Sequence, residues 1–257
     1  MDNAPLAIKI KEAARLVMNS KKAIALTGAG ISVESGIPPF RGPGGLWSKY
    51  DPALLDIRYF RQNPEKCWEF IYEIFYRFFR DARPNEAHIS LAELEKYGCL
   101  KSIITQNIDH LHQEAGSRTV HEFHGNSGTL VCGSCLKKYP AREMIQEKVP
   151  PVCPGCQKIL KPDFVFFGEP IPEQVLNLSF KEARSSDLLI LIGTTGEVYP
   201  AARIPVLAKQ NHAILIEVNP SESNYTGLVT DLFLQGQAGP VMGLLLKEVL
   251  KMKKKPD

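Results

Sequence analysis

The sequence predicts an α/β protein with a Rossmann-like, doubly wound parallel sheet that carries a small inserted module. Short apolar runs alternate with helical or loop sequence along most of the chain. That alternation is typical of parallel strands covered by helices on both faces. The segment 126–160 breaks the alternation, because it contains two Cys-x-x-Cys pairs between weak strands and turns.

Composition and length favour a globular protein with one large domain and an insertion. The chain has 257 residues, of which 44% are hydrophobic and 23% charged, close to the average for globular proteins. The net charge is +3, and the Lys-rich end, residues 251–255, is interpreted as a solvated helix end. We expect no specific nucleic-acid partner. With no leader-like N-terminus and no run of 18 apolar residues, we expect a cytoplasmic protein that does not bind membranes. The sequence leaves its oligomeric state open.

The first elements are a helix and a buried strand. Leu6, Ile10, Ala13, Ala14 and Val17 recur at helical spacing, and the apolar run 23–26 follows them. Further buried strands are expected at 102–105, 188–192 and 213–218.

Two insertions interrupt the strand and helix pattern. Residues 36–53 contain four glycines and four prolines, which predicts a flexible loop of the kind retained for function. A helical insertion follows at about 54–83. We expect residues 1–125 and 161–257 to form one discontinuous Rossmann-like domain, and 126–160 to form the small module.

A glycine-rich turn follows the first strand. Gly28-Ala29-Gly30 matches the start of the dinucleotide fingerprint, in which glycines let the backbone approach a pyrophosphate. The third fingerprint position is Val33, and no acidic residue ends a second strand at the expected distance. A conventional dehydrogenase is therefore disfavoured.

The four paired cysteines predict a structural zinc site. Cys132 and Cys135 are separated by 17 residues from Cys153 and Cys156, which is zinc-ribbon spacing. Four thiolates leave no open position for water, so the ion would be structural. A redox dithiol would need only one pair. Cys67 and Cys99 are interpreted as buried fillers.

Polar side chains gather where the expected strands end. Gln106, Asn107 and Asp109 follow the strand at 102–105, and such groups are costly at a buried edge unless they contact a ligand. An Asx turn that caps the next helix is the alternative. His121 and His124 are candidate bases. The same edge is expected to hold Gly193, Thr194, Thr195 and Asn219.

Together these motifs resemble the sirtuin family of NAD-dependent protein-lysine deacylases, of bacterial or archaeal type, from about Lys11 to Leu246. The resemblance implies NAD as a consumed cosubstrate, a structural Zn ion on the four cysteines, and an acylated-lysine protein or peptide as substrate. It also implies the cofactor-binding residues Gly28, Ala29, Gly30, Ser32, Ile37, Phe40, Arg41, Gln106, Asn107, Ile108, Asp109, His124, Gly193, Thr194, Thr195, Asn219 and Ala238.

The same resemblance implies how the reaction runs. The acyl amide oxygen attacks C1′ of the nicotinamide ribose, and His124 acts as general base on a ribose hydroxyl. Asn107 orients ribose and water, Asp109 with the backbone near Ile108 holds the nicotinamide carboxamide, and Phe40 excludes water. The products are nicotinamide, O-acyl-ADP-ribose and free lysine. A strand that pairs with the substrate peptide is implied at Val165, Phe166, Phe167, Gly168 and Glu169.

The preferred acyl group is predicted from the helix after Pro64. Family members that remove succinyl or malonyl groups carry a Tyr-x-x-Arg pair there, whereas this chain aligns Ile71 and Ile74, or Phe70 and Glu73. We therefore expect acetyl or longer apolar acyl groups over acidic ones. The many aromatic residues of this helix are interpreted as core, with an acyl channel as the alternative: Trp68, Phe70, Tyr72, Phe75, Tyr76, Phe78 and Phe79.

Two other functions remain open from the sequence. On the same fold, a mono-ADP-ribosyltransferase or NAD hydrolase would capture C1′ with a protein side chain or water. A non-catalytic module would only bind acyl-lysine or nucleotide.

Overall fold

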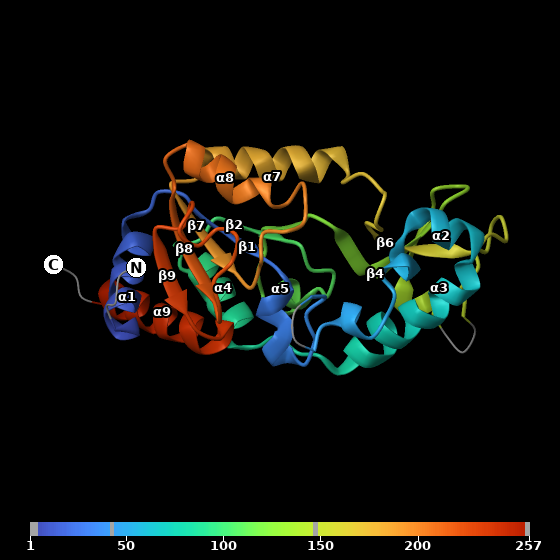
Figure 1. The fold of residues 1–257 in the computed structure, drawn as a ribbon, viewed down its shortest axis with the longest axis horizontal. Helices are drawn as coiled ribbons and strands as arrows, with labels where there is room; N and C mark the ends of the chain where they lie inside the picture. Colours follow the sequence, from blue (N-terminus) through green and yellow to red (C-terminus); the bar gives the residue numbers. More distant parts are fainter. Residues whose placement is uncertain (1–4, 42–43, 146–148, 255–257) are drawn as a thin grey trace.

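The computed structural model describes residues 5–41, 44–145 and 149–254, without the side chain of Phe78. The expectations that concern Gly42, Pro43, Lys255 and the Phe78 side chain lie outside the described residues. The α/β class is confirmed, with a six-stranded and a three-stranded sheet in the described part. Figure 1 shows the larger sheet with its helices at one end of the elongated molecule and the smaller sheet at the other.

The larger sheet is parallel throughout, in the order β3-β2-β1-β7-β8-β9. The strands expected at 23–26, 102–105 and 188–192 are present, and the one expected at 213–218 is shifted by one residue. The two edge strands, β3 and β9, carry no long apolar run and were not predicted. The six strands are β1 (Ala23–Thr27), β2 (Ser102–Thr105), β3 (Val120–Glu122), β7 (Leu188–Ile192), β8 (Ile214–Asn219) and β9 (Leu232–Gln235).

Helices cover both faces of this sheet, as doubly wound folds require. One hydrophobic cluster joins the sheet to α1, α4 and α9, and another joins it to α7 and α8. Figure 1 shows α7 and α8 together on one side of the sheet. The helices of this part are α1 (Leu6–Asn19), α4 (Glu86–Lys96), α5 (Leu111–Glu114), α7 (Glu173–Ser185), α8 (Arg203–Gln210) and α9 (Ala238–Lys253). Among the described helices, none combines the length and apolarity needed to cross a bilayer.

The order of the strands reverses between β1 and β7. After β1 the chain builds outward through β2 and β3, and it later returns to place β7 on the other side of β1. The loops that leave β1 and β7 therefore lie next to each other at the carboxyl edge of the sheet. This is the position at which open α/β sheets bind ligands.

The smaller sheet has the antiparallel order β5-β4-β6. It shares one hydrophobic cluster with the helical segment at 54–83, so we call residues 54–83 and 125–164 together the small lobe. The division of the chain at residues 126 and 160 remains a proposal. The elements of the lobe are η3 (Pro52–Leu55, at its start), α2 (Ile57–Gln62), α3 (Pro64–Ile71), a π-helix (Tyr72–Arg77), a 3₁₀ helix (Phe78–Asp81), β4 (Gly125–Cys132), β5 (Lys138–Pro140), α6 (Ala141–Met144) and β6 (Leu160–Phe164).

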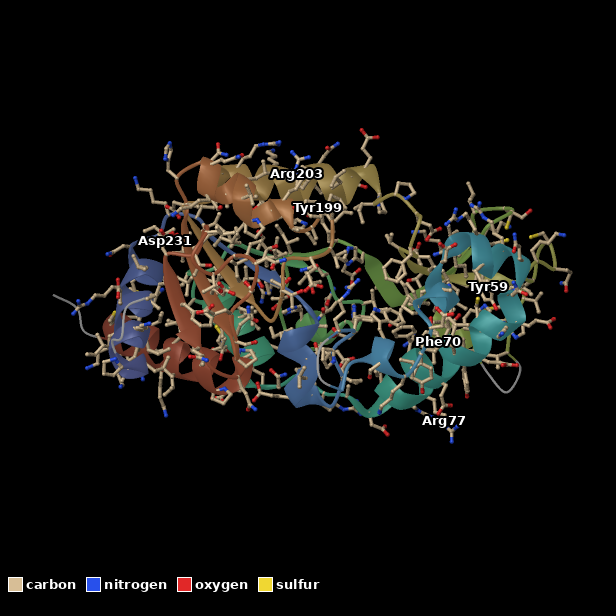
Figure 2. The ribbon with its side chains drawn as sticks, in the orientation of Figure 1. Tyr59, Phe70, Arg77, Tyr199, Arg203 and Asp231 are labelled. Carbon is tan, nitrogen blue, oxygen red and sulfur yellow. The ribbon has the colours of Figure 1, made fainter. Side chains whose placement is uncertain are left out.

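The aromatic helix forms core. Trp68 is fully buried and donates a hydrogen bond from Nε1 to the Leu160 carbonyl at 2.8 Å. The Tyr76 hydroxyl donates to the Ser127 carbonyl, also at 2.8 Å. Figure 2 shows Phe70 on the inner side of this helix and Arg77 at its outer edge. Cys67 is buried in the same cluster, as expected, whereas Cys99 is only half-buried.

Candidate active site

Two glycines after β1 allow the loops from β1 and β7 to cross in contact. The Gly28 amide donates to the Ile192 carbonyl at 3.0 Å, and the Gly30 amide donates to the Gly193 carbonyl at 2.9 Å. A Cβ on Gly30 would lie 2.6 Å from Gly193 Cα, closer than real side chains come. These glycines are therefore required by the protein backbone itself, in addition to any phosphate.

A cavity of about 720 Å³ opens above this crossing. It lies at the carboxyl ends of the central strands and extends to the small lobe. A volume of this order fits a ligand of drug or cofactor size. Most site residues expected from the sequence line it: Gly28, Ala29, Gly30, Phe40, Arg41, Gln106, Asn107, Ile108, His124, Val165, Phe166, Phe167, Gly168, Glu169, Gly193, Thr194, Thr195, Asn219 and Ala238.

Three expected residues lie behind the wall of the cavity. The Ser32 hydroxyl donates to Asp109 Oδ2 at 2.6 Å and accepts from Asn107 Nδ2 at 3.1 Å. Asn107 Nδ2 also donates to the Gly28 carbonyl at 3.2 Å. Ser32 and Asp109 thus hold Asn107, which does face the cavity. Ile37 is buried, and its amide donates to the Ser32 carbonyl.

His124 is fixed in one tautomer. Its Nδ1 lies 2.9 Å from the Gln106 carbonyl oxygen, and because a carbonyl can only accept, Nδ1 carries the proton. Nε2 is therefore the nitrogen with a free lone pair. Burial lowers the pKa of His124 below its ordinary value, and the hydrogen bond to Gln106 offsets part of that decrease. The ring is poised to accept a proton at neutral pH.

Aromatic residues close the side of the cavity near the small lobe. The ring of Phe40 lies 5.4 Å from that of Trp47, which in turn lies 6.0 Å from Phe167. Arg41 Nε lies 3.6 Å from Glu197 Oε2, so the cation of this loop has an anionic neighbour. The loop 36–53 therefore offers the cavity aromatic side chains and one cation, Arg41, whose charge is partly neutralised by Glu197.

The segment 165–169, which is expected to pair with a substrate peptide, follows the end of strand β6 at Phe164. Within it, Phe167 forms an isolated bridge to Asp56. The segment then turns, because the Glu169 carboxylate accepts a hydrogen bond from the Phe166 amide at 2.8 Å and Gly168 has a φ of 84°. Its pairing with a peptide stays a prediction. The segment still borders the cavity.

Sequence reasoning missed a further set of cavity residues. Most follow β7 and β8 or belong to the loop before the small lobe, and no motif marks them. For the residues after β7 and β8, the one signal in the sequence is their position just after a strand. Figure 2 labels one of them, Tyr199. The set includes Val33, Glu34, Trp47, Leu55, Ile171, Leu176, Glu197, Val198, Tyr199, Ser221, Glu222, Ser223 and Gln237.

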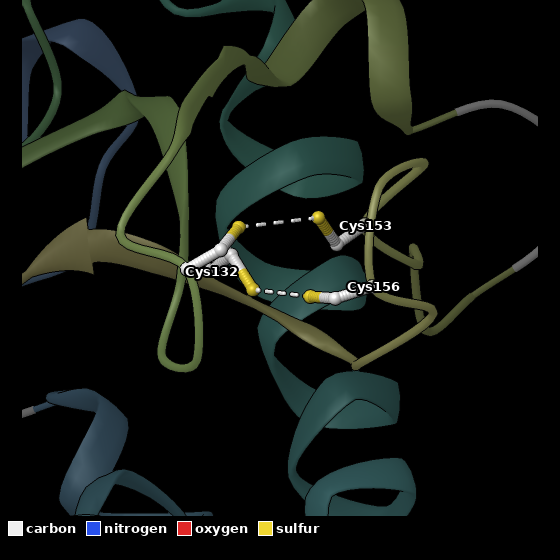
Figure 3. A group of neighbouring side chains, drawn as sticks. Cys132, Cys153 and Cys156 are labelled. Carbon is white, nitrogen blue, oxygen red and sulfur yellow. Dashed lines mark hydrogen bonds between the residues drawn. The ribbon is translucent and has the colours of Figure 1, made fainter.

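The four paired cysteines meet at one point of the small lobe (Figure 3). All four Sγ atoms lie within 4.8 Å of one another; Cys132 and Cys156 are 3.3 Å apart, and Cys135 and Cys153 are 3.7 Å apart. Tetrahedral zinc with Zn–S bonds of 2.3 Å needs separations of about 3.8 Å. The cluster therefore fits zinc. The Tyr139 hydroxyl lies 3.3 Å from Cys153 Sγ as a further polar neighbour.

Comparison with known proteins gives concordant matches. The profile described as "Sir2 family" matches residues 28–200. An NAD-dependent protein deacylase of Thermococcus sibiricus is 43% identical over 247 residues, covering 93% of this chain and 96% of that protein. An NAD-dependent protein deacetylase of Caldivirga maquilingensis is 46% identical over 243 residues, covering 93% of each.

Solved structures agree with these relatives. A mutant Sir2 homologue in complex with ADP ribose is similar with a TM-score of 0.91 and 39% identity, covering all of both chains. A complex of Sir2 with a p53 peptide and NAD⁺ has a TM-score of 0.86 and 36% identity, covering 93% of this chain and 98% of that one.

Proposed function

The chain belongs to the Sir2 family and is an NAD-dependent protein deacylase, and from that premise we propose that His124 is its general base. NAD is the cosubstrate, and the four cysteines fit a structural zinc ion. The observation that supports this role is the tautomer of His124, which lines the cavity. Its Nδ1 donates a hydrogen bond to the Gln106 carbonyl, so Nε2 is the nitrogen that can act as the base. Nε2 would remove a proton from a ribose hydroxyl.

The sheet edge would hold the dinucleotide. We propose that Gly28 and Gly30 lie against the pyrophosphate, with Arg41 beside it. Asn107 would orient the nicotinamide ribose, since Ser32 and the Gly28 carbonyl hold its amide group. Asp109 and the Ile108 backbone would bind the nicotinamide carboxamide. Gln106 would belong to the same nicotinamide and ribose site. The adenosine end would contact Gly193, Thr194, Thr195, Asn219 and Ala238, with Ala29, Ser32 and Ile37 completing the loop.

The substrate peptide would lie along the segment 165–169. Its residues line the cavity, and the Val165 amide donates to the His124 carbonyl at 2.8 Å. That contact links the peptide segment to the base. Phe40 and its neighbour Trp47 would cover the reacting sugar face and exclude water.

We propose that the enzyme prefers acetyl or longer apolar acyl groups. None of the residues that align with the Tyr-x-x-Arg pair, Ile71 and Ile74 or Phe70 and Glu73, is a cation, and Ile71, Ile74 and Phe70 are buried. Among the described residues that line the cavity, Arg41 is the only Lys or Arg, and it faces Glu197. A succinyl carboxylate would find no unshared cation there. The test is kcat/KM on acetyl-, myristoyl- and succinyl-lysine versions of one peptide, and a succinyl preference would contradict the proposal.

The role of His124 is tested by His124→Tyr. Lysine deacylation, followed by mass spectrometry of peptide and O-acyl-ADP-ribose, should fall by at least about 100-fold, whereas nicotinamide release should fall less because it needs no base. His121→Gln is the control, since His121 does not line the cavity. If His124→Tyr retained deacylation, the assignment would fail; if the wild type released nicotinamide without deacylating peptide, the chain would be an ADP-ribosyltransferase or NAD hydrolase.

We further propose that the enzyme acts on acylated proteins in the cytoplasm and requires neither nucleic acid nor membrane. The weak net charge of +3 supports this.

A further inference from the structure

A carboxylate is buried in the sheet beside the adenosine end of the cavity. Glu217, on strand β8, has no exposed surface. Figure 1 places β8 inside the larger sheet, between β7 and β9. A buried carboxylate is costly unless it is fully hydrogen-bonded, so the groups around Glu217 indicate what it does.

Four uncharged donors surround Glu217. Oε1 accepts from Asn219 Nδ2 at 2.9 Å and from the Ser223 hydroxyl at 2.5 Å. Oε2 accepts from the Thr226 hydroxyl at 2.8 Å and from the Thr230 hydroxyl at 2.6 Å. Both oxygens are thus satisfied, and one side chain ties the end of β8 to the loop that follows it.

Two of the hydroxyls already accept hydrogen bonds from the backbone. The Tyr225 amide donates to Ser223 Oγ at 3.1 Å, and the Ser223 amide donates to Thr226 Oγ1 at 3.0 Å. Their protons are therefore committed to Glu217. A glutamine at this position would present an NH₂ group to hydroxyls that need an acceptor, so only a carboxylate satisfies the whole set.

The same carboxylate fixes the orientation of Asn219. The amide nitrogen of Asn219 donates one proton to Glu217 and the other to the Thr194 carbonyl at 3.1 Å. The amide oxygen is left as the atom that can accept a proton from a ligand. Asn219, Thr194 and Ser223 all line the cavity.

We propose that Glu217 is a positioning residue for the adenosine half of NAD. It turns the Asn219 amide so that Oδ1 faces a nucleoside hydroxyl, and it holds Ser223 and the loop 223–230 against the cavity. The inference rests on the proposed placement of the adenosine at Asn219. Because Glu217 acts on the adenosine half alone, its loss weakens NAD binding without slowing the chemical step.

The test is Glu217→Gln, with steady-state kinetics at varied NAD and saturating acetyl-peptide. We expect KM for NAD to rise about tenfold, with kcat and KM for the peptide within about twofold. ADP-ribose affinity, measured by calorimetry without turnover, should fall by the same factor. Thr230→Val removes one of the four donors to Glu217 and should raise KM for NAD by a smaller factor, about threefold. This variant replaces Glu217→Gln as the test if Glu217→Gln does not fold.

The matched control is Glu182→Gln. Glu182 is a partly buried carboxylate on α7 that accepts from Ser102 at 2.8 Å and pairs with Lys22 at 3.0 Å, away from the cavity. The substitution Glu182→Gln should leave KM for NAD unchanged. Thermal unfolding of both variants shows whether a loss of stability alone moves KM.

A double-mutant cycle with Asn219→Ala separates the possible failures. If Glu217 acts through Asn219, the double variant loses little more ADP-ribose affinity than Asn219→Ala alone. Additive losses, an unchanged KM for NAD, or a fall in kcat as large as the rise in KM would each overturn the role of Glu217. If Asn219→Ala leaves ADP-ribose affinity unchanged, the placement of adenosine itself is wrong.

Discussion

At the scale of single residues, the environment of His124 determines the pH below which kcat/KM for deacylation falls. The base must be neutral, and burial lowers its pKa, so the neutral form persists below pH 6.5. We expect kcat/KM to fall as the pH falls through this lowered pKa, with the midpoint of the acid limb below pH 6.5. A pH profile on acetyl-peptide at several NAD concentrations measures it.

The control for this profile is again His121→Gln, which should leave the midpoint where it is. A midpoint above pH 6.5 would show that the imidazolium is stabilised in the site, contrary to the burial of the ring.

Two other histidines should make stability depend on pH. His88 and His112 are buried with ring centroids 4.9 Å apart, and burial lowers the pKa of His88 to about 4 and that of His112 to about 3. Between pH 6.5 and about 4 the unfolded chain binds protons that the folded chain refuses, so the unfolding free energy falls as pH falls. The slope from each histidine approaches, but does not exceed, about 1.4 kcal/mol per pH unit, at a pH well below 6.5 where the unfolded histidine is fully protonated.

Urea denaturation from pH 7 to pH 5 tests this slope. His112→Asn should flatten it, whereas a slope that is the same in wild type and variant would show that His112 does not carry it. His112 Nε2 lies 2.9 Å from the Thr27 hydroxyl. Asparagine is chosen because its amide group can form a hydrogen bond with that hydroxyl in place of the histidine.

At the scale of elements, the crossing of the β1 and β7 loops tolerates no side chain. We expect Gly30→Ala to cost about 1–3 kcal/mol of unfolding free energy, because its Cβ would lie 2.6 Å from Gly193 Cα. NAD affinity should fall as well. Chemical denaturation and ADP-ribose titration measure both effects.

Gly133→Ala is the matched control, since a Cβ at Gly133 would meet nothing within 4 Å. Equal costs at the two positions would mean that the clash is relieved by movement of the loops.

The zinc site should hold the small lobe together. Cys132 and Cys153 are buried in the cluster that also contains Trp68, so removal of the ion exposes this core. We expect Cys153→Ser, or a strong chelator, to lower the melting temperature and to change Trp fluorescence. The free thiol Cys99→Ser should change neither.

The same elements show where sequence reasoning succeeds. The central strands are short and mostly apolar, and three of the four predicted runs appear in the structure with at most one added residue. Edge strand β3 reads Val120-His121-Glu122 and is only half-buried, so nothing in its composition marks a strand. The pairing of segment 165–169 with a peptide stays a prediction, and in the structure the Phe166 amide donates to the Glu169 side chain.

At the scale of the whole molecule, the cavity is built from both parts of the chain. Motif residues mark the sheet side, since Gly, Asn and His have specific chemical roles there. The small-lobe side is lined by Trp47, Leu55 and Phe164, whose sequence signal is the same as that of core residues. Only the folded structure shows that Phe164 faces the cavity, whereas the described aromatic residues of the helix after Pro64 do not line it.

A ligand that fills this cavity should stabilise the whole chain. ADP-ribose at about 100 times its Kd should add about 2.7 kcal/mol to the unfolding free energy by mass action. Denaturation with and without ADP-ribose measures the increment, and Asn219→Ala should reduce it at the same concentration. No increment in the wild type would argue against ADP-ribose binding to the native state.

The crossing of Gly28 over Ile192 and Gly193 also has a consequence for the order of folding. The two loops are adjacent in space, yet β2, the small lobe and α7 lie between them in the chain. Contacts between such distant segments form slowly, because a long stretch of chain must be ordered first. During synthesis, both glycines leave the ribosome well before the loop that receives them. A nascent chain that ends before β7 therefore has no dinucleotide site, however complete its first two strands are.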